Sequence, residues 1–299
     1  MTFGQLNTFL AVARTGSVRA AAAALVVTEP AVSAAVTALQ RDLGVQLVTR
    51  RGRGVALTPA GETLARYAAE LLALRDQALG ELHGGRSLRL AAVTTAGEYL
   101  LPALLKGFRV QRPDIEVSLE VDNREHVMER LARREVDVAI GGRPPSSELG
   151  ITGAPLLRDR LVVVAAAGQQ IGDLSEQTWL LREPGSGTRT AVEAYLEEHG
   201  ITPRSTMTLG SNGAIRQAVA VGLGVSLMSN HAAGPELATG TIRRVEAPGT
   251  PLRRTWFVLR RDSGPETAPA SAFRAFCASR EARLALLAAL RPSLLSGAV

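Results

Sequence analysis

The chain contains 299 residues, of which 46% are hydrophobic and 21% are charged, and its formal net charge is +6. This length and apolar share are those of a soluble protein with two or three domains, with no need for a transmembrane helix. Cys277 is the single cysteine, which excludes a disulfide framework and indicates the reducing cytoplasm. The four histidines lack metal-binding spacing, so the sequence predicts no metal. We expect no other cofactor.

The positive charge is concentrated near the N-terminus. Residues 1–57 hold six arginines against Glu29 and Asp42, so two thirds of the net charge lies in a fifth of the chain. In the opening stretch, Leu6, Phe9 and Leu10 recur at helical intervals. A cationic start followed by a long apolar run is missing there, so we predict a first core helix and not a signal peptide.

Residues 17–44 predict a helix-turn-helix. Ser17 and Thr28 suit the N-caps of two helices, because a hydroxyl oxygen can accept a hydrogen bond from an early backbone N–H. Pro30 falls in the first turn of the second helix, and Gly44 fits the left-handed position that ends it. One face of this second helix is apolar and carries Val32, Ala35, Val36 and Leu39. The other face, predicted to meet solvent or DNA, carries Pro30, Ser33, Ala34 and Thr37.

A basic hairpin follows the helix pair. Two short apolar runs flank a turn that contains Arg50, Arg51, Gly52, Arg53 and Gly54, a pattern that predicts a two-stranded wing. Arginines in such a wing bridge phosphates or enter a narrow minor groove. The alternative for each arginine is a solvated turn. Together, the helix pair and the basic wing predict a partner of double-stranded DNA.

Residues 17–61 resemble the DNA-binding domain of LysR-type transcriptional regulators, whose pattern runs S-x-x-x-A-A-x-x-L, T-Q-P-A-V-S, L-E-x-x-L-G and then a basic wing. The matching residues are Ser17, Ala21, Ala22, Leu25, Thr28, Pro30, Ala31, Val32, Ser33, Leu39, Leu43, Gly44, Leu57, Thr58 and Gly61. The resemblance implies an all-α winged helix-turn-helix domain over residues 1–60. Within it, the predicted DNA-binding residues are Glu29, Pro30, Ser33, Ala34, Thr37, Arg50, Arg51 and Arg53.

Two departures from the family pattern lie on the second helix. Glu29 stands where the family commonly has glutamine, and Ala34 and Thr37 stand where it often has arginine or lysine. Glu29 either complements the helix dipole in the first turn or accepts a hydrogen bond from a cytosine amino group. Fewer cations on this helix give the wing a larger share of the electrostatic attraction to DNA.

Residues 58–86 predict a long helix that ends in a hinge. An apolar stripe runs along it and consists of Leu64, Tyr67, Leu71, Leu74, Ala78 and Leu82. A stripe of this length would not stay in water, so the helix either pairs with a second copy or packs on its own effector domain. In the LysR family this is the linker helix that dimerises the DNA-binding heads, which implies a homodimer or homotetramer. His83 to Ser87 break the helix and mark the hinge.

From residue 87 onward, strands and helices alternate in two similar halves, the pattern of an open α/β fold with two lobes. The final helical stretch predicts that the chain crosses back to finish the first lobe. We place lobe I at about 87–163 and 262–299, and lobe II at about 164–261. This is the layout of a periplasmic-binding-protein-like effector-binding domain, which the LysR family carries after its linker helix.

Ligands on such folds bind between the lobes, where strand ends meet helix N-termini. Four loops at predicted strand ends supply hydroxyls, exposed N–H groups and arginines, which suit an anion. The predicted effector-binding residues are Thr94, Thr95, Arg143, Ser186, Gly187, Thr188, Arg189, Ser211 and Asn212. The alternatives are that Ser186 or Thr188 only caps its own helix, and that Arg143 and Arg189 serve contacts between the lobes.

Three stretches, at 141–145, 182–189 and 211–229, are similar to the LysR branch that contains regulators of carbon-fixation operons and relatives of sulfur-assimilation regulators. Those proteins respond to small, often phosphorylated metabolites, which implies a small anionic effector here. An enzyme is disfavoured because no serine, histidine and acid cluster, metal set or nucleotide motif stands out. A solute-binding protein of a transport system is the remaining alternative, opposed by the N-terminal helices and the lack of an export segment.

Overall fold

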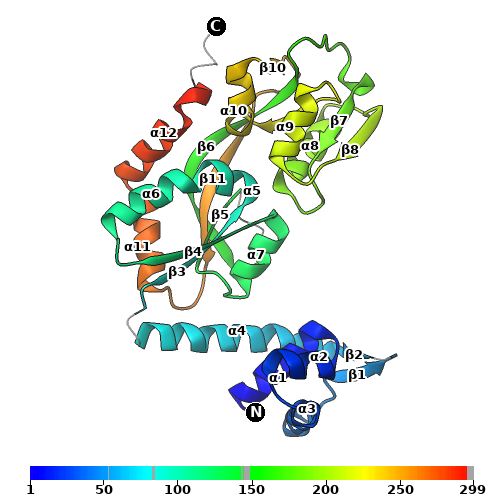
Figure 1. Ribbon diagram of the computed structural model, residues 1–299, viewed down its shortest axis with the longest axis vertical. Helices are drawn as coiled ribbons and strands as arrows, with labels where there is room; N and C mark the ends of the chain where they lie inside the picture. Colours follow the sequence, from blue (N-terminus) through cyan, green and yellow to red (C-terminus); the bar gives the residue numbers. More distant parts are fainter. Residues whose placement is uncertain (53, 83–84, 143, 145–148, 295–299) are drawn as a thin grey trace. The chain divides into compact units, whose positions relative to one another are not determined.

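The computed structural model describes all residues except 53, 83–84, 143, 145–148 and 295–299 (Figure 1). The chain forms two compact units. The first contains Met1–Gly84 with Arg133–Glu135, and the second contains Gly85–Ala132 and Val136–Val299.

The first unit is a helical head with a two-stranded wing. It contains α1 (Phe3–Thr15), α2 (Val18–Leu25), α3 (Glu29–Leu43), β1 (Val48–Arg51), β2 (Gly54–Leu57) and α4 (Pro59–Leu82). The predicted caps are confirmed, because the hydroxyls of Ser17 and Thr28 accept from the backbone N–H groups of Ala20 and Ala31. A cap of this kind is worth about 1 kcal/mol. Gly44 adopts the predicted left-handed conformation, with φ of 68°.

Two apolar clusters hold the head together. One joins α1, α3 and α4 through Leu6, Phe9, Leu39, Leu47, Ala68 and Leu72, and the other joins α1, α2 and α3 through Ala11, Val12, Ala21, Ala22, Val32 and Val36. Gly61 lies so close to the chain before the wing that a Cβ there would come within 2.0 Å of the Leu47 carbonyl oxygen. Any side chain at this position would push α4 away from the head.

Among the described residues, no single helix is long and apolar enough to cross a membrane. The pair α2 and α3 passes the length and composition test only when both helices are counted together, and the chain bends by 107° between them.

The second unit has the predicted two-lobed α/β architecture. Lobe I is built on the parallel strands β3 (Ser87–Val93), β4 (Glu116–Asp122) and β5 (Val138–Gly141). Helices α5 (Thr94–Tyr99), α6 (Leu101–Gln111), α7 (Arg124–Ala132), α11 (Ala268–Cys277) and α12 (Arg280–Leu294) complete it. The largest apolar cluster lies between the sheet and helices α6, α11 and α12, and it includes Phe108, Phe273 and Phe276.

Lobe II contains a 3-10 turn, η2 (Leu174–Glu176), the strands β7 (Thr178–Leu181), β8 (Ser205–Thr208), β9 (Ser226–Ser229) and β10 (Ile242–Val245), and the helices α8 (Gly187–Glu198), α9 (Asn212–Ala220) and α10 (Asn230–Thr239). Strands β9 and β10 pair with β6 (Ile151–Ala166), whereas β7 and β8 form a parallel pair of their own. Two apolar clusters lie in this lobe, one around Trp179 and Tyr195 and the other around Ile215 and Met228.

Two long antiparallel strands, β6 and β11 (Leu252–Arg261), run through both lobes (Figure 1). The predicted lobe boundaries at 163/164 and 261/262 therefore need correction. Leu161 already packs in the core of lobe II, and Trp256 and Val258 pack in the core of lobe I. The chain changes lobes inside these strands, and a continuous strand gives no glycine or proline signal at the crossing.

The structure also contains elements that the sequence did not predict. Strand β6 begins at Ile151, ten residues before the apolar run that indicated it, because its first half pairs with β11 at half-exposed positions. Helix α10 contains Pro235, and strand β10 contains the consecutive arginines Arg243 and Arg244. These residues conceal the apolar pattern of both elements.

Candidate functional site

The exposed face of α3 carries every residue predicted to meet DNA on that helix. Glu29, Pro30, Ser33, Ala34 and Thr37 are all exposed. The opposite face is fixed to the head by the buried residues Val32, Val36 and Leu39. The exposed face is therefore free for contact with a groove, and its side chains are small apart from Glu29.

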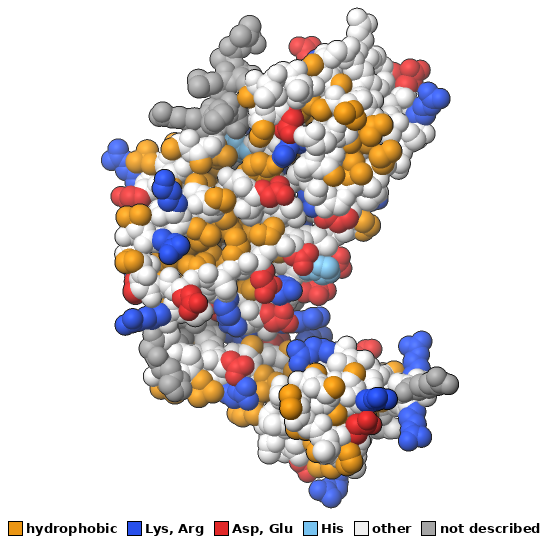
Figure 2. All heavy atoms as spheres, viewed as in Figure 1, with side chains coloured by type: hydrophobic (Ala, Val, Ile, Leu, Met, Phe, Trp, Pro, Cys, Tyr) orange, Lys and Arg blue, Asp and Glu red, His pale blue; other side chains and the backbone are white. Residues whose placement is uncertain are grey.

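The wing is a hairpin in which Arg51 pairs with Gly54 and Val48 pairs with Leu57. Arg50 and Arg51 are exposed, and neither forms an ion pair within the described part of the chain. Gly54 lies against the corner between α1 and α2, where a Cβ would come within 2.8 Å of the Gly16 carbonyl oxygen. Figure 2 shows basic side chains projecting around this hairpin. The prediction for Arg53 falls outside the described residues.

A cavity of about 670 Å³ lies in the second unit between the two lobes. Its wall is made by the ends of β3 and β4, the start of α7, the loop before α8, one face of α8, and the crossing strands β6 and β11. The residues that line it are Val93, Thr94, Thr95, Asn123, Arg124, Gly142, Leu161, Arg182, Ser186, Gly187, Thr188, Thr190, Ala191, Ala194, Tyr195, Glu198, Leu252, Arg254 and Trp256.

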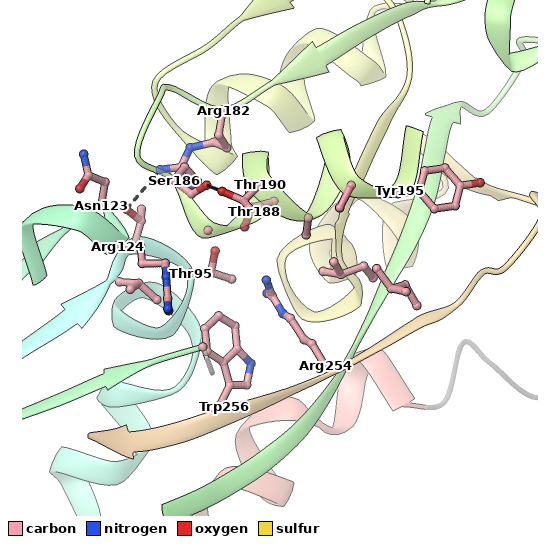
Figure 3. Close-up of a pocket in the computed structure, with 18 of the residues that line it drawn as sticks. Thr95, Asn123, Arg124, Arg182, Ser186, Thr188, Thr190, Tyr195, Arg254 and Trp256 are labelled. Atoms are coloured by element: carbon pink, nitrogen blue, oxygen red, sulfur yellow. Dashed lines mark hydrogen bonds between the residues drawn. The ribbon is translucent and has the colours of Figure 1, made fainter. Parts of the chain in front are cut away.

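The predicted hydroxyl residues gather at one end of this cavity. Thr95, Ser186 and Thr188 all line it and are buried, with residue exposures of 5%, 5% and 8% (Figure 3). Ser186 is the N-cap residue of α8, but its side chain makes no capping hydrogen bond. The alternative in which Ser186 only caps its helix is therefore wrong, and its hydroxyl can serve a ligand at a helix N-terminus.

The glycines of the same loop allow its close approach to lobe I. Gly185 has φ of 82°, and a Cβ there would come within 2.9 Å of Glu125 Oε2. Gly187 lies close to Arg124, whose Cδ would be 3.3 Å from a Cβ. A side chain at Gly185 would be strained by the positive φ and would have to move the side chains of Glu125 and Asn123, whereas one at Gly187 would require a small shift of Arg124.

Three arginines at the cavity were not predicted. Arg124 opens α7, and burial lowers the pKa of its guanidinium group from the ordinary value. Arg182 is only 2% exposed, and it donates hydrogen bonds to Glu183, to Asn212 over 2.9 Å and to Thr94 over 3.2 Å. Arg254 comes from the crossing strand β11 and pairs with Asp159.

Sequence position points to two of these arginines and not to the third. Arg124 and Arg182 follow the carboxyl ends of β4 and β7, which is where ligands bind in open α/β folds. Arg182, however, stands next to a glycine-rich loop, and the residues of that loop give a stronger sequence signal for ligand binding than Arg182 does. Arg254 lies within a strand, where sequence alone gives no sign that the strand borders a cavity.

Three predicted effector residues do not line the cavity. Arg189 is engaged within lobe II, where its guanidinium group donates to Glu193, the Arg182 carbonyl oxygen and Thr208. Ser211 caps α9 through the N–H of Ala214. Asn212 is buried behind the wall, where it bonds residues that do line it. Arg143 lies outside the described residues.

The comparisons with known proteins identify the family. The family model for the bacterial regulatory helix-turn-helix protein of the lysR family matches residues 3–62, and the LysR substrate binding domain model matches residues 83–282. The chain belongs to the LysR family of transcriptional regulators. The helix-turn-helix domain sets aside the alternative of a transport solute-binding protein.

The relatives of this LysR-type regulator include proteins of carbon fixation. It is 37% identical over 277 residues to the HTH-type transcriptional regulator CfxR of Cupriavidus necator, covering 88% of this chain and 86% of that protein. It is 35% identical over 271 residues to the RuBisCO operon transcriptional regulator of Acidithiobacillus ferrooxidans, covering 86% of this chain and 87% of that protein. The predicted resemblance to carbon-fixation regulators is confirmed.

Two solved structures share the fold of this LysR-type regulator. The regulatory domain of Synechocystis CcmR in complex with 2-PG is 34% identical, with a TM-score of 0.60 over 64% of this chain and 95% of that one. The LysR family regulator CbnR is 23% identical, with a TM-score of 0.66 over 94% of this chain and 99% of that one.

Proposed function

We propose that this LysR-type regulator binds double-stranded DNA through the exposed face of α3 and through Arg50 and Arg51 of the wing. Five exposed residues of α3 lie on one face, and the two wing arginines are unpaired among the described residues. Phosphate contacts by arginine hold a reading helix in register, while base edges are read by the helix. Glu29, exposed in the first turn of α3, either complements the helix dipole there or accepts a hydrogen bond from a cytosine amino group.

The same proposal includes assembly through α4. Tyr67 and Leu71 of the predicted stripe are 55% and 41% exposed, and Leu82 at the end of the helix is 81% exposed. The buried contacts of α4 with its own head come from Ala68 and Leu72, and of the stripe only Leu64 packs, partly buried, against that cluster among the described residues. An apolar stripe left in water supports pairing with a second copy, and two paired heads fit a two-fold-related operator.

For the second unit, we propose that the cavity binds a small anionic metabolite. The observation that carries this proposal is the Ser186 hydroxyl, which is buried at the start of α8 and free of a capping role. The hydroxyls of Thr95 and Thr188 and the guanidinium group of Arg124 line the same cavity. Hydrogen-bond donors, a cation and a helix N-terminus together favour an anion. The 2-PG complex of the CcmR regulatory domain supports this ligand class.

An enzymatic role is not part of the proposal. The structure does bring Ser229, His231 and Asp159 together, which the sequence spacing did not reveal. However, the Ser229 hydroxyl donates directly to Asp159 over 3.0 Å, so the histidine is not placed to take its proton. All three side chains are buried. Among the described residues, no group of three or more histidine, cysteine, aspartate or glutamate side chains could hold a metal ion.

Calorimetry with the full-length protein tests the ligand proposal. The probes are 2-PG, inorganic phosphate, a hexose phosphate and a nucleoside monophosphate. We expect at least one to bind in the micromolar to millimolar range, and we expect the double variant Thr95→Ala/Thr188→Ala to lose most of that affinity. Thr206→Ala, on the exposed face of β8, is the matched control. Heat from no probe, or undiminished binding by the double variant, would rule the proposal out.

DNA binding is measured with the same protein. We expect the bound metabolite to change the affinity for operator DNA. If the two sites are coupled, the coupling free energy contributes equally to metabolite binding and to DNA binding. The reciprocal measurement, in which operator DNA changes the metabolite affinity by the same factor, checks that the two sites belong to one coupled system.

A further inference from the structure

Arg254 reaches the cavity from within a strand and not from a loop. It lies on β11 directly opposite Asp159 on β6, so the two residues form a cross-strand pair. These are the two strands that connect the lobes. The pair therefore joins the cavity wall to the part of the fold where the lobes are linked.

The guanidinium group of Arg254 is held on two sides. Its Nε donates to Asp159 Oδ2 over 2.6 Å. Its carbon Cζ lies 4.1 Å from the centre of the Trp256 ring, which is a stacking distance. A planar guanidinium group that is both hydrogen bonded and stacked has little freedom to rotate.

Asp159 is itself fixed. Its side chain is fully buried, and Oδ1 accepts hydrogen bonds from Ser229 Oγ over 3.0 Å and from the backbone N–H of Arg160 over 2.8 Å. The carboxylate thus has a set orientation before any ligand arrives. Its second oxygen is the one that holds Arg254.

The Nη2 nitrogen of Arg254 is not used by the described part of the protein. Nη2 is buried and has no hydrogen-bond partner among the described residues. Leaving a buried charged donor without an acceptor is unfavourable. Figure 3 shows the side chains of Arg254 and Arg124 extending into the cavity on either side of Thr95. An acceptor on a ligand in this cavity would satisfy the free donor.

We propose that Arg254 selects for the anionic group of the ligand and that Asp159 is the positioning residue that aims it. This inference rests on the proposed function of the cavity and adds two residues on the crossing strands to it. Because the guanidinium group is aimed in advance, it favours an anionic oxygen over a neutral hydroxyl, since a charge-assisted hydrogen bond is the stronger of the two. Lysine at this position has no planar fork to stack and bond in this way.

The test measures the affinity of the full-length protein for 2-PG and inorganic phosphate by calorimetry. We expect Arg254→Lys and Asp159→Asn each to weaken binding of the probe at least tenfold. In the double variant Arg254→Lys/Asp159→Asn, the second substitution should weaken binding by less than a further factor of two, because Asp159 acts through Arg254. Arg253→Lys is the matched control, since Arg253 is the neighbouring residue of β11 and is exposed. It should bind like the unmodified protein.

Arg254→Lys keeps a positive charge beside Asp159, so it tests the inference even where Asp159→Asn fails to fold, as thermal melts would show. If Arg254→Lys binds the probes within twofold of the unmodified protein while Thr95→Ala/Thr188→Ala does not, the role of Arg254 is overturned and the cavity proposal stands. If the losses of binding free energy in Arg254→Lys and Asp159→Asn add fully in the double variant Arg254→Lys/Asp159→Asn, the positioning role of Asp159 is overturned. If the unmodified protein binds none of 2-PG, inorganic phosphate, the hexose phosphate and the nucleoside monophosphate, the cavity proposal itself fails and this inference fails with it.

Discussion

Asn212 of lobe II donates a hydrogen bond to Thr95 of lobe I over 3.2 Å, and both side chains are buried. The same amide nitrogen donates to Glu98 over 2.9 Å, and the amide oxygen accepts from Arg182 over 2.9 Å. One side chain outside the cavity thus bonds two residues of its wall, Thr95 and Arg182. It also links α9 of one lobe to α5 of the other.

Replacement of Asn212 by alanine tests this link. The variant leaves a buried donor of Arg182 without its acceptor, so we expect the free energy of unfolding to fall by about 1–3 kcal/mol. Urea denaturation measures this change. Gln217→Ala, at an exposed position of the same helix, should have little effect. Equal stability of the two variants would contradict a structural role for the link.

The position of Asn212 shows what the sequence could and could not predict about the cavity. Strand ends and helix starts are visible as changes of pattern, which is why Thr95, Ser186 and Thr188 are predictable. A loop position does not reveal on which side of the wall its side chain lies, however. Asn212 supports the wall from behind, and Arg189 bonds Glu193 on the outer side of α8.

The fold itself was largely predictable. Capping residues, apolar periodicity and the family pattern indicate the head, the long helix and the two lobes. The lobe crossings were misplaced because β6 and β11 continue through both lobes, where local sequence carries no mark of the change. Arg254 was missed for the same reason. Its place beside the cavity depends on pairing with Asp159 on the neighbouring strand, and the two residues are 95 positions apart in the chain.

The wing arginines are expected to attract DNA of any sequence. Arg50→Ala/Arg51→Ala should weaken binding to operator and unrelated duplexes alike, because phosphate contacts carry no sequence information. The slope of log affinity against log salt should become shallower by up to about two, roughly 0.9 for each phosphate that the variant no longer neutralises. Fluorescence anisotropy over a range of salt concentrations measures both. Arg109→Ala/Arg112→Ala, which removes the same charge from α6 and its C-terminal end, should leave the slope unchanged.

The exposed stripe of α4 is expected to mediate assembly. Leu71→Glu places a charge in the stripe, and burying that charge against a second copy would be unfavourable, so the variant should shift toward monomer. Sedimentation velocity measures the distribution. Ala73→Glu adds the same side chain about 200° around the helix and should leave assembly unchanged. A Leu71→Glu protein with the mass of the unmodified protein would show that the copies meet elsewhere.

His231 is expected to reduce the stability of the second unit in acid. Burial lowers the pKa of its imidazole below the ordinary value of 6.5, and the charge of Arg254 lowers it further, whereas Asp159, with Oδ1 3.7 Å away, opposes the shift. Between the lowered pKa and 6.5, the unfolded chain binds more protons than the folded one, so stability falls as the pH falls. Above this window, the contribution of His231 does not change with pH.

The measurement compares urea denaturation of the unmodified protein and of His231→Asn between pH 7.5 and 5.0. Other titrating groups are common to both proteins, so their contributions cancel in the difference between the two free energies of unfolding. We expect the unmodified protein to lose stability relative to the variant as the pH is lowered. His126→Asn, at a side chain that is 56% exposed, should not reproduce this loss. A difference for His231→Asn that stays constant with pH would show that the imidazole is charged as readily in the fold as in the unfolded chain, against the burial that the structure shows.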